Sequence, residues 1–271
     1  MKACRDIGLT THEAPMDIAR YPLALFILSF FGLALSAWLG ARCRASHRTP
    51  ERAAQEHFGL VIGATLTLLG LIIGFTFSMA LTRYDLRKNY EEAEANAIGT
   101  EFVRADLLPA ADAAKVRALL LRYVDQRILF YTVHDQQRLR QINDQTAKLQ
   151  AELWSAVLPQ ALAQPTPVTA LAVAGMNDVL NSQGYTQAAW WNRIPPAAWG
   201  LMATLAVCAN ALVGFAVGKS GALWILPLVV SIAFFLMADI DAPRRGVIRV
   251  VPQNLLSLSE SLRAQSSSPA R

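Results

Sequence analysis

The stretch Phe58–Tyr90, FGLVIGATLTLLGLIIGFTFSMALTRYDLRKNY, decides the fold of this chain. Its first 24 residues, as far as Leu81, contain no charged side chain. About 20 apolar residues are enough for a helix to cross a bilayer. Three basic residues, Arg83, Arg87 and Lys88, then follow within a short distance. The stretch therefore predicts a membrane-spanning helix that enters a basic aqueous region at its C-terminal end.

Three further apolar runs, at 22–40, 198–218 and 222–238, are long enough or nearly long enough to span a membrane. The 271 residues are 54% hydrophobic and only 17% charged, whereas soluble domains usually carry about 25% charge. This composition argues against a soluble enzyme. The predicted parts are an N-terminal segment 1–21, two membrane helices in 22–81, a polar helical region 82–197, two membrane helices in 198–238, and a tail 239–271 that is disordered from about 266.

Four spans place both termini and the polar region 82–197 on one side of the membrane. Most of the basic residues near the spans also lie on that side, and the positive-inside rule makes it the cytoplasm. The polar region carries twelve basic and twelve acidic residues, so it is not a nucleic-acid-binding surface.

Proline spacing predicts long helices in the polar region. No proline lies between Pro50 and Pro109, and those 58 residues would make one helix of about 87 Å, far longer than the bilayer core of about 30 Å. The second span should therefore continue into the cytoplasm. A second proline-free stretch covers 110–158. A third helix is expected at 168–182, with Gly184 as its stop and Pro195-Pro196 opening the third span.

The second span sorts into two stripes on a helical wheel. One stripe contains Gly63, Gly70 and Gly74, whose spacing is typical of close helix packing in membranes. The neighbouring stripe consists of Thr67, Leu71, Phe75, Ser78 and Thr82. Its residues have three possible roles: ordinary packing, the lining of a pore with a hydrophobic constriction, or a polar seam in a proton-driven motor.

Other chemistry-bearing residues predict no catalytic or metal site. Cys4, Cys43 and Cys208 have no metal-like spacing, so we expect no metal, cofactor or enzymatic activity. Glu94 and Glu101 are seven residues apart and share a helix face, but no histidine or cysteine accompanies them. We expect them to form buried ion pairs between helices.

The segment GFTFSMALTRYDLR resembles the second-span signature of the bestrophin channels, and the segments EANAIGTEFVRADLLP and DIDAPRRGVIRV extend the likeness to a bacterial bestrophin-like group, DUF4239. The resemblance implies a homopentamer of four-span, all-helical subunits in a bacterial inner membrane. It also implies a pore neck at Thr67, Leu71 and Phe75, although Thr67 is polar where the family usually has an apolar residue.

Animal bestrophins, which this chain resembles, bind a regulatory calcium ion through an acidic run after the last span. Only Asp239 and Asp241 remain here, and Arg244 and Arg245 follow them at once. Calcium needs six to eight oxygen ligands, so we expect a salt-bridged corner and no calcium gating.

The resulting expectation is a pentameric channel for small inorganic ions, surrounded by lipid. Thr67, Leu71, Phe75 and Ser78 would line the pore, while Gly63, Gly70 and Gly74 would pack behind it. Arg83, Arg87 and Lys88 could form cationic rings at the pore mouth, which slightly favours anions, or they could be interfacial anchors. The alternatives are a ring-forming motor-type proton-channel subunit, which needs a partner helix with a membrane aspartate, and a non-conducting membrane scaffold.

Overall fold

The computed structural model describes residues 21–46, 52–218 and 220–267, and these residues form helices joined by short connections. Most of the segment 1–21 and residues 268–271 of the tail lie outside them. The chain divides into two compact units, 1–71 with 202–246, and 72–201 with 247–271. The division falls within α2 (Arg52–Arg104) and α6 (Pro196–Val217), each of which is one continuous helix.

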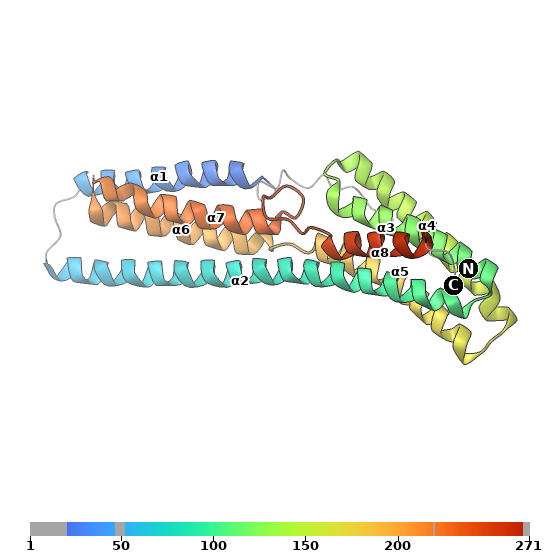
Figure 1. The fold of residues 1–271 in the computed structure, drawn as a ribbon. Coiled ribbons are helices and arrows are strands. Elements are labelled where there is room, and N and C mark those ends of the chain that lie inside the picture. The colour runs from blue at the N-terminus through green and yellow to red at the C-terminus, as the bar shows by residue number, and fades with distance from the viewer. Residues whose placement is uncertain (1–20, 47–51, 219, 268–271) are drawn as a thin grey trace, which may run out of the picture. The chain divides into compact units, whose positions relative to one another are not determined.

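The first unit contains the apolar helices α1 (Pro22–Ser46), α6 and α7 (Ile225–Asp241), which Figure 1 shows side by side. The short helix η3 (Gly221–Trp224) precedes α7. Together with α2, these helices supply four candidate membrane spans in the described residues, as the apolar runs predicted. The outer faces of α1 and α7 expose large apolar side chains such as Phe31 (65%) and Ile225 (61%), as lipid-facing surfaces do.

Glycine brings α1 and α6 into close contact. A Cβ atom at Gly40 would collide with the backbone oxygen of Ala211, and one at Gly214 would collide with that of Ala37. The hydroxyl of Ser36 also donates a hydrogen bond of 2.8 Å to the carbonyl oxygen of Val207. Small residues and an interhelical hydrogen bond are the usual means of joining helices in lipid, where burial of apolar surface gives little drive.

The second unit is a helical assembly around one hydrophobic core. It contains the C-terminal part of α2, the short η2 (Ala105–Leu107), α3 (Ala110–Thr132), α4 (Gln136–Ala163), α5 (Pro167–Trp191) and α8 (Gln253–Ser267). Helix α3 packs against α4 and α8, and α4 packs against α5. The core includes residues from all of these helices, among them Ile98, Leu120, Leu153, Met176 and Leu255, and none of these five exposes any surface.

Several helix boundaries differ from the sequence prediction. Helix α5 passes through Gly184 and ends only at Trp191, because the flanking residues Ser182, Thr186 and Ala189 are buried and packing offsets the glycine's weak helix preference. Helix α4 likewise passes through Pro159. Residues 266 and 267, which we expected to be disordered, close α8, a helix that the sequence analysis missed.

Candidate pore-lining helix

Helix α2 has a buried face that runs along most of its length. At about 100° per residue, its buried positions fall within an arc of about 120°. They include Leu69, Thr76, Ala80, Arg87, Glu91, Glu94, Ile98 and Glu101. The residues of α2 that are covered by their own chain therefore lie on one side of the helix.

The stripe expected to line a pore lies on the opposite face of α2. Its centre is about 180° from the centre of the buried arc. Thr67, Leu71, Phe75 and Ser78 are all exposed, with Leu71 at 50% and Phe75 at 63%. The hydroxyl of Thr82 donates to the carbonyl oxygen of Ser78 in its own helix. The stripe thus leaves much of its surface uncovered by its own subunit.

Three glycines of α2 also lack contacts within the subunit. In the described part of the chain, apart from its own helix, nothing lies within 4 Å of a Cβ placed on Gly63, Gly70 or Gly74. Close packing within the subunit is found instead at Gly40 and Gly214. The prediction that Gly63, Gly70 and Gly74 allow close helix packing therefore concerns contacts between two copies of the protein, and it stays a prediction.

The three basic residues after the stripe are arranged differently from the prediction. Arg87 is 1% exposed, and it donates hydrogen bonds to the carbonyl oxygens of Ala189 (3.2 Å) and Asn192 (3.1 Å) at the end of α5. A cation is stabilised there by the helix dipole. The prediction of a cationic ring is therefore wrong for Arg87, because this guanidinium is used inside the subunit. Arg83 is half-buried, and Lys88 is exposed.

The charges in line with the stripe are acidic. Arg83, Arg87 and Lys88 all lie about 100° or more from the centre of the stripe, whereas Asp85 and Glu92 lie within about 60° of it. Both carboxylates are exposed, as is Asn89 between them. Neither acidic residue was among the predicted pore residues, although the helical period places both in line with the stripe beyond Thr82.

The carboxylate of Glu94 is the centre of a buried polar cluster. Its partners are the Arg127 guanidinium, the Thr186 hydroxyl at 3.2 Å and the Tyr131 hydroxyl at 3.4 Å. Burial, followed by the negative charge of Glu94, raises the pKa of Tyr131, so the phenol keeps its proton and can donate it. The prediction of a buried ion pair between helices is confirmed for Glu94, since Arg127 lies on α3. Glu101 has no hydrogen-bond partner among the described residues.

The acidic residues at the end of α7 are buried. Asp239 is 3% exposed and Asp241 is 4% exposed. Gly246 packs against the backbone of Asp239, and the Arg245 guanidinium lies 4.4 Å from the ring centre of Tyr21. Among the described residues, no group of three or more histidine, cysteine, aspartate or glutamate side chains is arranged to hold a metal ion.

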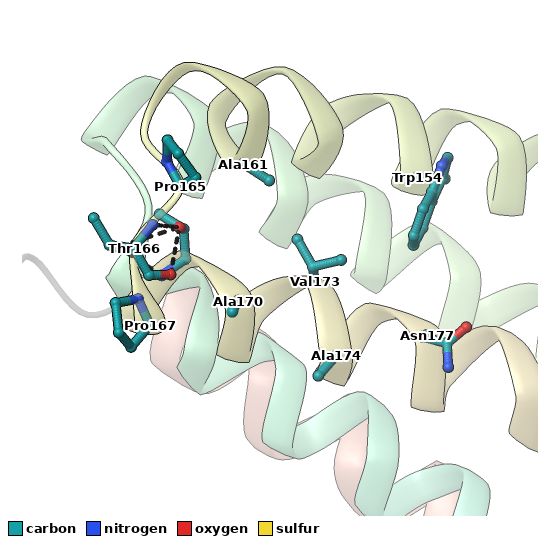
Figure 2. Close-up of a pocket in the computed structure, with 10 residues that line it drawn as sticks. Trp154, Ala161, Pro165, Thr166, Pro167, Ala170, Val173, Ala174 and Asn177 are labelled. Carbon is teal, nitrogen blue, oxygen red and sulfur yellow. Dashed lines mark hydrogen bonds between the residues drawn. The ribbon is translucent and has the colours of Figure 1, made fainter.

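The second unit also contains a cavity of about 680 Å³ between the end of α4 and the start of α5. Figure 2 shows Trp154 and Val173 on its walls and Thr166 at one end. Thr169 also lines the cavity. The hydroxyls of Thr166 and Thr169 form the N-terminal capping box of α5, and the lining contains no charged side chain. The cavity is therefore not a candidate ion site.

The fold and the arrangement of α2 define an all-helical membrane protein with a long helix that is nearly unpacked in its apolar part. The chain belongs to the bestrophin-like family, because the family's domain model matches residues 27–255. No match to a curated protein was found.

Solved structures share this fold. Two crystal structures of a bacterial bestrophin homologue from Klebsiella pneumoniae, each with one substitution, are 14% and 13% identical to this chain. The first gives a TM-score of 0.61 over 91% of this chain and 99% of the homologue. The second gives 0.64 over 92% and 99%.

Proposed function

We propose that the protein is an oligomeric ion channel, in which the exposed stripe of α2 from each copy surrounds a shared axis. Family membership supports this proposal, and the resemblance in sequence favours five copies in a bacterial inner membrane with cytoplasmic termini. Leu71 and Phe75 would form a hydrophobic neck that ions cross only when it is wetted. Thr67 and Ser78 would supply its polar ends.

The main support for the proposal is that very little of the apolar part of α2 is covered by the rest of its own chain. Only 6% of the most apolar 18-residue stretch of α2 is buried within the subunit, against 39% for the corresponding stretch in Gly221–Asp241, which contains α7. A helix that leaves Leu71, Phe75 and three glycines uncovered has the features of one that packs between copies. In such a ring the buried face holds α2 to its own subunit, and the opposite face meets the axis.

The charges on α2 lead us to revise the expected sign of the ion. Rings of Asp85 and Glu92 would lie on the cytoplasmic continuation of the stripe and concentrate cations there. Arg87 is buried, and Arg83 and Lys88 point away from the stripe's direction. We therefore propose that small cations pass more readily than the anions that the sequence alone favoured.

Two measurements on the purified protein test this function. The mass of the detergent-solubilised particle gives the number of copies, and bilayer recording in asymmetric salt gives conductance and the sign of the ion. A pentamer with single-channel currents and a cation-directed reversal potential is expected. A monomeric particle, or bilayers that stay silent with correctly inserted protein, would overturn the proposal.

A further inference from the structure

Glu101 differs from the other two buried glutamates of α2. Glu91 accepts hydrogen bonds from the side chain of Asn254 (2.6 Å) and the backbone N–H of Leu255 (2.9 Å), and Glu94 accepts from the cluster around Arg127. Glu101 is equally buried, with 0% of its surface exposed, yet neither of its carboxyl oxygens accepts a hydrogen bond from the described residues. This carboxyl group lies where an ionised form is poorly solvated.

The carboxyl group of Glu101 packs directly against the backbone of α5. A Cβ atom at Gly175 would collide with Oε2 of Glu101, and it would lie 2.6 Å from Nη1 of Arg104. Gly175 is itself buried. At this point α2 and α5 therefore leave no room for a side chain at position 175 unless the carboxyl group of Glu101 moves.

The charged groups around Glu101 do not compensate an ionised carboxylate. Arg104, one turn further along α2, favours the ionised form, and Asp178 of α5 opposes it. Arg117 of α3 is held by the side chain of Asp106 and the carbonyl oxygen of Phe102. Burial is the largest effect, and it raises the pKa of Glu101 from 4.5 to about 8. Glu101 is thus mostly neutral near pH 7.

We propose that Glu101 and Gly175 form a proton-dependent contact between α2 and α5, which stays closed while the carboxyl group is neutral and loosens when it ionises. An ionised carboxylate needs water or a donor, and the backbone of Gly175 supplies neither. The attraction of Arg104 is smaller than the effect of burial, so we expect the two helices to separate locally and admit water when Glu101 ionises. The consequence for ion flow rests on the function proposed above, since α2 is the helix that would line the pore. There, alkaline cytoplasmic pH would act on the cytoplasmic extension of the pore helix.

Hydrogen exchange of the full-length protein tests this contact without any measurement of conductance. With a pKa of about 8, the ionised fraction of Glu101 rises from about a tenth at pH 7 to about nine-tenths at pH 9. After correction for the intrinsic rate, we expect exchange in residues 170–180 to rise by about tenfold over this range. In Glu101→Gln the same peptides should change by less than about twofold, because glutamine carries no charge at either pH. Glu260→Gln, an exposed control on α8, should behave like the wild type.

An infrared titration of the wild type provides a second readout, which does not depend on whether the variant folds. Loss of one protonated-carboxyl band near pH 8 is expected. The proposal is overturned if the wild type shows no such band, or if wild type and Glu101→Gln share the same exchange profile. If the contact depends on pH but the protein passes no ions, the inference about Glu101 is supported and only the proposed channel function is wrong.

Discussion

Glu94 of α2 and Arg127 of α3 form an ion pair in which both side chains are completely buried. Tyr131 and Thr186 donate further hydrogen bonds to the Glu94 carboxylate, which helps to offset the cost of burying its charge. Nη1 of Arg127 has no hydrogen-bond partner among the described residues, and the guanidinium lies 4.5 Å from the ring centre of Phe130. The pair therefore fixes the direction in which α2 meets the rest of its unit.

Breaking this ion pair should destabilise the protein strongly. We expect Arg127→Met to cost about 3–5 kcal/mol, because it leaves the Glu94 carboxylate buried without its cation. Thermal unfolding in detergent measures the effect, with the exposed pair Arg122 and Glu152 as the comparison. Arg122→Met should change stability by less than about 1 kcal/mol. Equal losses of stability in the two variants would contradict the buried position of the Glu94–Arg127 pair.

Widening the proposed neck should increase ion flux. Leu71→Ala combined with Phe75→Ala removes two bulky apolar groups from the stripe, so the constriction should stay wetted for longer. We expect a severalfold rise in flux into proteoliposomes. Phe31→Ala on α1 is the matched control, since Phe31 is about as exposed as Phe75 but lies on another helix. Unchanged flux through an active wild type would count against the neck.

Neutralising the acidic residues in line with the stripe should weaken cation preference. Asp85→Asn with Glu92→Gln removes two negative charges per copy from the proposed pore mouth, so the reversal potential in asymmetric salt should move toward zero. Asp144→Asn on α4 removes an exposed carboxylate elsewhere and should leave the potential unchanged. If Lys88→Gln shifts the reversal potential and the acidic substitutions do not, the channel prefers anions, as the sequence alone had favoured.

Substitutions at two glycines should distinguish helix packing within a subunit from helix packing between copies. In Gly214→Ala the new methyl group meets the backbone of Ala37, and overpacking of this kind costs about 1–3 kcal/mol. In Gly74→Ala the methyl group meets no other part of its own described chain, so the subunit should keep its fold. Particle mass should fall for Gly74→Ala if copies pack there, while thermal unfolding should change mainly for Gly214→Ala.

Stability should fall as the pH rises toward 8, and Glu101 should be one cause. Its folded-state pKa of about 8 lies above the ordinary value of 4.5, so the folded protein holds a proton that the unfolded chain releases in between. The stabilising effect of this proton is full below the unfolded pKa and is lost as the pH rises through the folded one. Glu101→Gln should flatten the melting-temperature profile between about pH 5 and 8. A parallel profile in the variant would rule out this assignment.

The sequence alone determined the architecture of this protein. Apolar runs of sufficient length can satisfy their backbone in a bilayer only as helices, so four spans followed directly from composition. The absence of proline between Pro50 and Pro109 similarly predicted the long α2, and the wheel placed Leu71 and Phe75 on one face. These are local properties, set by the period of the helix and by the solvent around it.

Only the tertiary structure decided which side of α2 is used within the subunit. Arg87 and Lys88 are adjacent in sequence, yet one is bound to the end of α5 and the other is exposed. Glu94 and Glu101 share a face, but α3 brings a guanidinium to the first and α5 brings a glycine to the second. Which partner a side chain meets depends on residues far away in the chain, and no local pattern contains that information.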